Sequence, residues 1–332
     1  MTVKETQSVA PFVSVVVPLF NKAPHVERSL RSVLAQSLHN WELIVVDDAS
    51  TDGGAEIAAR ILEGVPCARI LKREMPSPGG YAARNLGARE SGADWIAFLD
   101  ADDEWSPGLL EEYRRLAAMF PEVGFLGTAH REMLPNGQLR LDPYVAARPT
   151  AHPRCIDLLT YALEGASGRN PLQTSTVAVR KRLLFAVGAF PENRCVRGGD
   201  RDTWLRLLAA SDLAWSPYLG AVYHRDAVNM VTKTTPLEVR NCMDQTFVLL
   251  IGDRALSARF PAQLRRALKR LSNYEKRGAI RSRIRAGDLK PIDLRSFYFC
   301  ADPLYCISIL VAALLPGTLL RWLYARREGA FR

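Results

Sequence analysis

The stretch Asp94-Trp-Ile-Ala-Phe-Leu-Asp-Ala-Asp-Asp103 joins a short apolar run to three closely spaced carboxylates, Asp100, Asp102 and Asp103. The apolar run predicts a buried strand. Carboxylates this close raise one another's pKa unless a cation neutralises them, and hard divalent cations prefer oxygen ligands, so the pattern favours a Mg²⁺ or Mn²⁺ site. The alternative is an Asp-rich turn in which one Asp caps a helix expected from about residue 106.

A second acidic cluster follows another apolar strand. Residues 41–46 run directly into Asp47 and Asp48, and Asp52 follows shortly after. The carboxyl ends of parallel strands lie along one edge of an open sheet, where ligands bind, so the two clusters are predicted to face one pocket. The first strand leads into Leu19-Phe-Asn-Lys-Ala-Pro24 rather than a Gly-x-Gly-x-x-Gly turn, which argues against a dinucleotide-binding Rossmann turn.

The wider pattern predicts an α/β fold. Between Val13 and about His130, strand candidates alternate with helical stretches, which is typical of βαβ crossovers and a mainly parallel sheet. The strand candidates are 13–18, 41–46, 68–72, 94–99 and 123–129, and the helical stretches are 24–37, 52–63, 80–91 and 107–119. Residues 131–170 are predicted to be irregular. Regular structure is expected to resume with a strand from Thr174, helices from about 181 and 200, and a strand near 221.

Composition and charge add limits on the class of protein. The 332 residues are 48% hydrophobic and 24% charged, as in a globular protein. The net charge of +9 is uneven, because the residues from Arg254 onward carry 17 Lys and Arg against 5 Asp and Glu. This asymmetry indicates an anionic partner, either a membrane surface or nucleic acid. Nucleic-acid binding is not expected, because no RNP-like or helix-turn-helix signature accompanies the charge.

Cysteines and the N-terminus indicate a cytoplasmic protein. The six cysteines are scattered and form no C-x-x-C pair, which predicts neither a zinc site nor a disulfide framework and favours reduced thiols. Residues 1–11 are polar, lack the apolar core of a signal peptide and are expected to be disordered.

Residues 233–332 are predicted to form a basic helical C-terminal region. Leu264, Leu268 and Leu271 give an apolar stripe between cationic residues. The uncharged run from Leu304 ends at Pro316-Gly317 and is too short to span a membrane, which needs about 20 residues. The arginines and aromatic residues at 321–327 suit a lipid headgroup layer, so peripheral attachment to the inner face of the cell membrane is one expectation. The alternative is a helix packed on the domain or on a second subunit of a homo-oligomer.

Four ordered stretches resemble motifs of the family 2 glycosyltransferases, which have the GT-A fold. They are Val13-Ser-Val-Val-Val-Pro-Leu-Phe-Asn21, Leu43-Ile-Val-Val-Asp-Asp-Ala-Ser-Thr-Asp-Gly53, Gly79-Gly-Tyr-Ala-Ala-Arg-Asn-Leu-Gly87 and Phe98-Leu-Asp-Ala-Asp-Asp103. The resemblance covers about residues 12–232 and implies a nucleotide-sugar half (12–130) and an acceptor half (131–232). It also implies a nucleotide-diphosphate sugar donor, a divalent metal (Mn²⁺ or Mg²⁺) on a D-x-D element, and transfer with inversion.

The resemblance also implies roles for residues of the donor side. Asp102 is expected on the metal and Asp100 on the ribose or the metal. Asp103 is also acidic in many relatives, and the alternative for it is a helix cap. The residues expected to line the nucleotide-sugar pocket are Pro18, Asn21, Asp47, Asp48, Asp52, Gly80, Arg84, Asn85 and Asp100.

On the acceptor side, Gly199-Asp200-Arg201-Asp202-Thr-Trp204 stands where many relatives carry a Glu-Asp pair. Asp200 matches the second acid and is the expected general base, with an N-cap role as the alternative. Gly199 replaces the first acid. Asp202 is expected to serve the first helical turn or a nearby Arg. In the segment Tyr223-His224-Arg225, His224 is a further candidate for metal or phosphate contact.

The expected function is transfer of a sugar from a nucleotide-diphosphate sugar to a saccharide or lipid-linked glycan, in cell-surface polysaccharide or glycolipid synthesis. The missing Gln-x-x-Arg-Trp motif of processive synthases favours single additions. Two alternatives stay open at this point: a nucleotidyltransferase of related fold, and a non-catalytic sugar-nucleotide-binding protein, which the replacement at Gly199 suggests.

Overall fold

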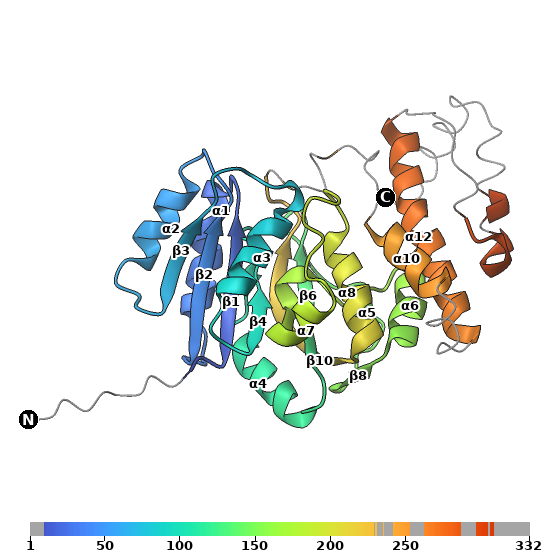
Figure 1. The fold of residues 1–332 in the computed structure, drawn as a ribbon, viewed down its shortest axis with the longest axis horizontal. Helices are drawn as coiled ribbons and strands as arrows, with labels where there is room; N and C mark the ends of the chain where they lie inside the picture. The colour runs from blue at the N-terminus through green and yellow to red at the C-terminus, as the bar shows by residue number, and fades with distance from the viewer. Residues whose placement is uncertain are drawn as a thin grey trace, which may run out of the picture.

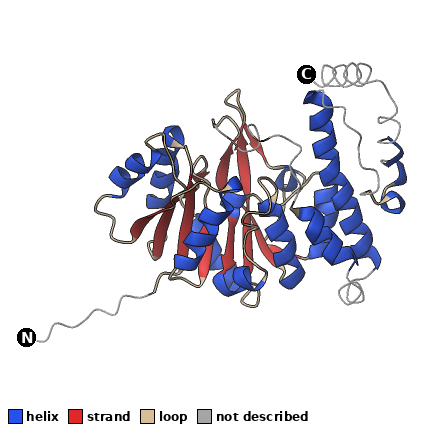
Figure 2. Cartoon of the chain, turned by 45° about the horizontal axis from the view of Figure 1, so that its top comes forward, coloured by secondary structure: helices blue, strands red, loops and turns tan. Residues whose placement is uncertain are grey.

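The computed structural model describes residues 10–228, 230, 235, 242–252, 262–286, 297–304 and 306–308. A ten-stranded sheet runs through the molecule in the order β3-β2-β1-β4-β9-β6-β10-β5, with β7 beside β6 and β8 beside β10. Helices flank this sheet, which confirms the predicted α/β class (Figures 1 and 2). The predicted disordered segment 1–11 lies almost wholly outside the described residues.

The donor half is a parallel β/α unit. Its strands are β1 (Val13–Leu19), β2 (Trp41–Asp47), β3 (Ala68–Lys72) and β4 (Trp95–Phe98), and its helices are α1 (Ala23–Leu34), α2 (Gly54–Leu62) and α3 (Tyr81–Glu90). Alternate residues of β1 face opposite layers: Val15 packs with α1, whereas Val16 packs toward α3. A Cβ on Gly87 would lie 2.4 Å from the Val16 side chain, so this glycine lets α3 lie close against the sheet.

The sheet as a whole is mixed rather than mainly parallel. Strand β9 (Val177–Arg180) enters antiparallel between β4 and β6 (Phe125–Met133), and β10 (Leu213–His224) runs parallel to β6. Between β6 and β9 the chain forms β8, which pairs with β10 on the other side of β6 from β9. The predicted strand from Thr174 is in part a 3-10 turn, Thr174–Thr176. The short strands and remaining helices are β5 (Glu104–Trp105), β7 (Leu139–Leu141), β8 (Arg154–Ile156), α4 (Leu109–Met119) and α7 (Lys181–Ala186).

The stretch predicted to be irregular, 131–170, contains regular structure. Besides β7 and β8 it forms α5 (Pro143–Ala146) and α6 (Leu158–Ala166). Both helices begin at an aspartate N-cap: Asp142 accepts from the backbone of Tyr144 and Val145, and Asp157 accepts from the backbone of Thr160. The prediction was wrong because it gave the Pro and Gly content of this stretch more weight than its two capping aspartates.

The described C-terminal helices pack on the acceptor half. Helices α10 (Met243–Gly252) and α12 (Ala262–Ala286) lie beside α6 and α8 (Gly199–Ala210), and all four contribute to one hydrophobic cluster (Figure 1). Leu264, Leu268 and Leu271, the predicted apolar stripe, are buried in that cluster. The boundary predicted after residue 232 stays a prediction.

Most of the uncharged run from Leu304, and all of its flanking arginines and aromatics at 321–327, lie outside the described residues. A 3-10 turn, Phe299–Ala301, precedes this run. Within the part of the chain that the structure describes, no helix combines the length and the apolar character that crossing a bilayer would require.

Candidate active site

The predicted edge of the sheet brings the loops after β1 and β2 together. The Asn21 side chain accepts a hydrogen bond from the Thr51 backbone at 2.9 Å, and the Asn21 backbone donates to Ser50 Oγ at 3.2 Å. These bonds hold Asn21 in the left-handed region, at φ +51°, which asparagine tolerates better than most residues. Asp52 accepts from the Ala23 backbone at 2.8 Å and so fixes the start of α1.

The two aspartates that follow β2 are buried and hydrogen-bonded. Asp47 accepts from the Ser50 backbone at 3.0 Å. Asp48 forms an ion pair with Arg73 and accepts from both the backbone and the hydroxyl of Ser77. Asp48 therefore fixes the loop that leads into the Gly-Gly turn at the rim of the predicted nucleotide pocket.

Arg84 contacts Asp100, the first aspartate of the D-x-D element. Its guanidinium pairs with Asp100 and donates to the Gly79 carbonyl at 3.0 Å. Gly79 and Gly80 both have positive φ, and a Cβ on Gly80 would lie 3.2 Å from the Arg84 guanidinium and 3.8 Å from the Pro18 ring. Burial raises the pKa of Asp100, and Arg84 opposes this rise.

Asn85 takes a different place from the predicted one. Its side-chain amide accepts from the Phe190 backbone N–H and donates to the Phe190 carbonyl, both at 3.0 Å. Only 3% of Asn85 is exposed. Asn85 thus ties α3 to the loop before α8 and connects the two halves of the site rather than facing the pocket.

The three carboxylates after β4 have separate partners. Asp102 pairs with Lys22 at 2.6 Å. Asp103 is fully buried and accepts from Ser175 Oγ at 2.6 Å, Gln173 Nε2 at 2.8 Å and the His224 backbone at 3.0 Å. Burial, together with Asp102 and Asp100, raises its pKa well above the usual value. Asp103 does not cap α4, because the N-cap of this helix is Gly108.

The donor set suits a divalent metal only in part. No group of three or more His, Cys, Asp or Glu side chains within the described ranges is placed to hold an ion. His224 Nδ1 lies 3.2 Å from Asp226, and its buried Nε2 has no hydrogen-bond partner among the described residues. Carboxylate oxygens and imidazole nitrogens are ligands that Mn²⁺ accepts, so Asp102 and His224, whose Nε2 lies 3.7 Å from Glu104, have the chemistry of metal ligands.

Asp200 lies in the first turn of α8, between the donor and acceptor halves. Its charge contributes to raising the pKa of Asp100 and Tyr81 on the donor side and of Glu275 on the acceptor side. Gly198, at φ +78°, is the N-cap of α8, so the capping alternative for Asp200 does not hold. Asp202 is fully buried and pairs with Arg206 at 2.8 Å, as expected.

Tyr81 fills the space beside Gly199. The Gly199 backbone N–H donates to the Tyr81 hydroxyl at 2.8 Å, and that hydroxyl donates to the Val196 carbonyl at 3.4 Å. A Cβ on Gly199 would lie 2.5 Å from the Tyr81 ring and 2.7 Å from Pro191. A glutamate therefore has no room at this position.

Sequence reasoning missed four residues of the site: Lys22, Tyr81, Ser175 and Arg197. Lys22 and Tyr81 stand inside the quoted motifs, but no local signal distinguishes them. Arg197 is half-buried in the loop before α8, and within the described residues no carboxylate forms an ion pair with it. Burial and the neighbouring Arg201 lower its pKa.

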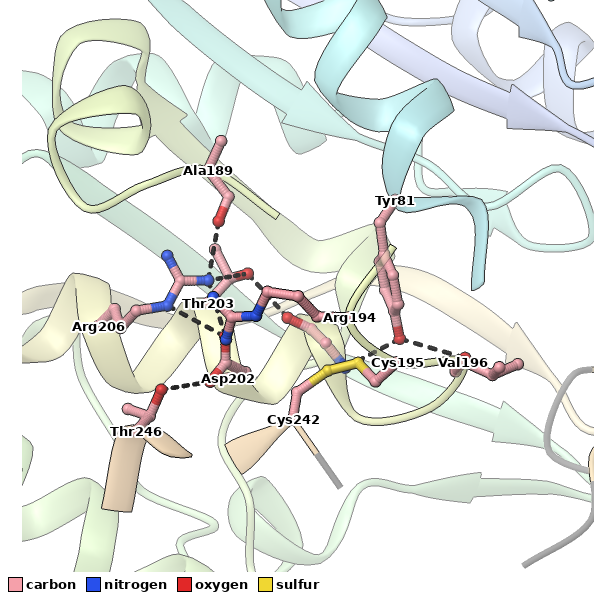
Figure 3. Close-up of a disulfide and its surroundings, with 11 residues drawn as sticks. Tyr81, Ala189, Arg194, Cys195, Val196, Asp202, Thr203, Arg206, Cys242 and Thr246 are labelled. Atoms are coloured by element: carbon pink, nitrogen blue, oxygen red, sulfur yellow. Dashed lines mark hydrogen bonds and ion pairs between the residues drawn. A yellow bond between two sulfur atoms is a disulfide. The ribbon is translucent and has the colours of Figure 1, made fainter. Parts of the chain in front are cut away.

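The expectation that all cysteines are reduced was wrong. Cys195 and Cys242 form a disulfide with Cα atoms 5.7 Å apart, which joins the loop before α8 to the start of α10 (Figure 3). They are 47 residues apart in sequence, so only the packing of α10 beside this loop brings them together. Cys67, Cys155, Cys300 and Cys306 are free.

Comparisons with known proteins agree with this geometry. Residues 14–142 match the model of glycosyl transferase family 2. The chain is 32% identical over 198 residues to glycosyltransferase AglE of Haloferax volcanii, an alignment that covers 58% of this chain and 60% of AglE. Residues 14–142, the donor half and the start of the acceptor half, are therefore similar to glycosyl transferase family 2.

Two solved structures share the fold. TarS of S. aureus, in complex with UDP-GlcNAc, aligns with a TM-score of 0.70 and 15% identity, over 95% of this chain and 91% of that one. Mannosyltransferase PcManGT from Pyrobaculum calidifontis, in complex with GDP-Man and Mn²⁺, aligns with a TM-score of 0.56 and 17% identity, over 96% and 85%. The chain has the GT-A fold.

Proposed function

We propose that the chain is an inverting glycosyltransferase that moves a sugar from a nucleotide-diphosphate sugar to a saccharide or lipid-linked glycan acceptor. The observation that carries this proposal is the position of Asp200. Asp200 stands in the first turn of α8, which the bond from the Gly199 N–H to the Tyr81 hydroxyl joins to the donor half and which packs beside α6 and α10 on the acceptor side. A general base at this position deprotonates an acceptor hydroxyl on the side of the sugar opposite the leaving group.

The donor residues have roles that follow from their contacts. Asn21 and Asp52 order the loops that border the nucleotide, and Asp47 and Asp48 hold the strand end beneath it. Gly80 leaves the backbone open next to Pro18, where the nucleotide and sugar approach. Arg84 pairs with Asp100 and so fixes its carboxylate where the ribose is expected to lie. The TarS and PcManGT structures are complexes with UDP-GlcNAc and GDP-Man, which supports the donor class without choosing the base or the sugar.

Asp102 and His224 Nε2 would hold Mn²⁺ or Mg²⁺, with Asp100 beside them. The ion, when bound, would neutralise the charge that develops on the departing diphosphate. The Mn²⁺ in the PcManGT structure supports this choice of metal. Lys22 pairs with the Asp102 carboxylate at 2.6 Å and so fixes its position before the donor binds. Transfer by direct displacement needs one base, which Asp200 supplies, and inverts the anomeric carbon.

A donor panel tests the proposal. UDP-, GDP- and dTDP-sugars are assayed for thermal stabilisation and slow hydrolysis with Mn²⁺ and again with EDTA. Stabilisation and hydrolysis of at least one donor, both lost in EDTA, are expected. Asp212→Asn changes a carboxylate at the opposite end of β10 from His224. This variant controls for loss of an aspartate outside the proposed site and is expected to behave as wild type. Donor binding without hydrolysis or transfer would support a sugar-nucleotide-binding protein, and release of pyrophosphate from a nucleoside triphosphate would support a nucleotidyltransferase.

We also propose that the basic C-terminal region attaches the enzyme to the inner face of the cell membrane, where a lipid-linked acceptor is presented. Each Lys or Arg near an anionic surface contributes about 1 kcal/mol, and the residues from Arg254 onward carry an excess of 12 positive charges. Flotation with vesicles that contain phosphatidylglycerol is expected at low salt and not at high salt. A chain ending at Asp302 that still floats, or a full chain that never floats, would overturn this attachment.

A further inference from the structure

A cavity of about 220 Å³ lies between α6, α8 and α12. Its volume is below the ~300 Å³ at which pockets for drug-sized ligands begin, so it suits a single sugar ring rather than a longer chain. The lining residues are Tyr161, Gly165, Gly168, Asn170, Arg201, Leu205, Met243, Leu271, Tyr274 and Glu275.

Two of the residues that line the cavity form an ion pair. Arg201 on α8 contacts Glu275 on α12 at 2.6 Å, and only 9% of the Glu275 side chain is exposed. Among the lining residues these are the two charged ones, so the formal charge of the lining is zero. A lining with no net charge gives an anionic ligand no attraction and leaves hydrogen bonding to decide what binds.

The uncharged polar groups of the cavity suit a polyhydroxylated ligand. Tyr161, Asn170 and Tyr274 bring two phenol groups and one amide to the lining, and the Tyr274 hydroxyl lies beside Gly168. A Cβ on Gly168 would lie 2.7 Å from that hydroxyl, and its φ of +77° also favours glycine. Phenol and amide groups beside apolar Leu205 are the mixture of polar and apolar contacts that a pyranose ring needs.

Asp200 connects this cavity to the donor site. Its charge raises the pKa of both Tyr161 and Glu275, two residues of the lining, and it precedes Arg201 in α8. The same carboxylate acts on Asp100 of the D-x-D element. A ring that contacts Arg201 in the cavity therefore lies beside the helical turn that carries Asp200.

The geometry points to this cavity as the acceptor subsite, and to a neutral saccharide unit, rather than a uronate or a phosphate, as the group that it takes. This inference rests on the proposed function, because it assigns the acceptor of that reaction. It makes Asn170 and the Arg201–Glu275 pair the determinants of acceptor choice.

Binding of methyl glycosides to the full chain tests the inference without requiring turnover. Neutral methyl hexosides and N-acetylhexosaminides are each paired with the corresponding uronate, and their affinities are measured by saturation-transfer NMR and titration. Wild type is expected to bind at least one neutral glycoside about tenfold or more tighter than its uronate. Asn170→Ala is expected to weaken that binding severalfold, whereas Tyr298→Phe, on the 3-10 turn away from the lining, keeps it.

A charge change gives the sharper result. Glu275→Gln leaves the Arg201 guanidinium unpaired, and an arginine fork binds carboxylates with charge-assisted bonds, so the preference should move toward the uronate by about tenfold. Glu164→Gln is the matched control. Glu164 lies on α6 outside the lining and pairs with Arg148 and Arg169, so its loss should not change the preference.

The possible outcomes separate the two proposals. Failure of wild type to bind any methyl glycoside, a wild-type preference for uronates, or equal behaviour of the variants and their controls would overturn the acceptor subsite while leaving donor turnover intact. Glycoside binding that follows the predicted pattern in a protein that turns over no nucleotide sugar would support the cavity and overturn the proposed function instead.

Discussion

The donor and acceptor sides of the site are constructed in different ways. On the donor side, the functional carboxylates stand at the ends of parallel strands, and their cations come from neighbouring strand-end loops, as with Asp102 and Lys22. On the acceptor side, Asp200 precedes Arg201, which lines a cavity where α6, α8 and α12 meet, and the pair Arg201–Glu275 joins residues 74 positions apart. The comparison teaches that donor chemistry depends on local loop geometry, whereas acceptor chemistry depends on helix packing.

The largest expected effect is the loss of sugar transfer after a change at Asp200, with donor binding unchanged. Asp200→Asn preserves the shape of the side chain but cannot accept a proton, so transfer should fall by about 100- to 10,000-fold. Donor affinity should stay near that of wild type, because the strand-end loops are untouched. Calorimetry for the donor and a product assay for transfer measure both. Transfer within a few-fold of wild type would leave Asp202, buried beside Arg206, as the next candidate for the base.

The disulfide provides the next largest effect. Cys195→Ser with Cys242→Ser opens a closure of 47 residues, which a chain-entropy model values at about 4 kcal/mol of unfolding free energy. The loop before α8 and the start of α10 would both lose their link, so acceptor turnover should suffer more than donor binding. Denaturant unfolding measures the stability. Cys155→Ser, an exposed free thiol, is the control, and equal stability of the two variants would contradict the predicted role of the bond.

The donor side could largely be predicted from sequence. Apolar strands that run into Asp, Asn and Gly signal their own ends, and parallel pairing then places those ends together, which is why β1, β2 and β4 and their acidic ends were predicted. The details that failed concern partners. Asn85 bonds to Phe190, 105 residues away, and nothing near Asn85 in the sequence indicates that contact.

On the acceptor side, only the sequence motif could be predicted. The Gly199-Asp200 stretch gave the candidate base and the helix, but the cavity depends on the packing of α12 against α6, and the disulfide depends on the start of α10. Antiparallel β9 between β4 and β6 was also missed, because strand order is decided by long-range pairing rather than by the pattern within a strand. Contacts of this kind leave no periodic signal in the sequence.

A third prediction returns to the donor side. Asp102→Asn removes the charge that pairs with Lys22 and that would hold the metal. Loss of an outer partner of a metal site costs ~10–100-fold in affinity, and a direct ligand should cost at least as much in Mn²⁺-dependent donor binding. Titration of a nucleoside diphosphate with Mn²⁺ and with EDTA measures the difference. Asp212→Asn, at the opposite end of β10 from His224, is the control, and unchanged Mn²⁺ dependence in Asp102→Asn would remove this residue from the metal site.

The smallest expected effect tests the junction between the two sides, where Tyr81 of α3 meets Gly199 of α8. Gly199→Glu restores the acid that many relatives carry, but its Cβ would lie 2.5 Å from the Tyr81 ring, and overpacking of this kind costs about 1–3 kcal/mol of unfolding free energy. Adding Tyr81→Val should recover much of that loss. The two changes should therefore couple by about 1 kcal/mol in a double-mutant cycle measured by denaturant unfolding.

Gly278→Glu on α12, where a Cβ meets no atom within 4 Å, is the control for the added charge and should couple with Tyr81→Val by nothing measurable. Additive losses at 81 and 199 would show that the tyrosine does not occupy the place of the missing glutamate. Coupling of the expected sign would mean that the loss of that acid and the presence of the phenol are one structural change. In that case the Tyr81 hydroxyl, through its bond from the Gly199 N–H, positions the turn that carries Asp200.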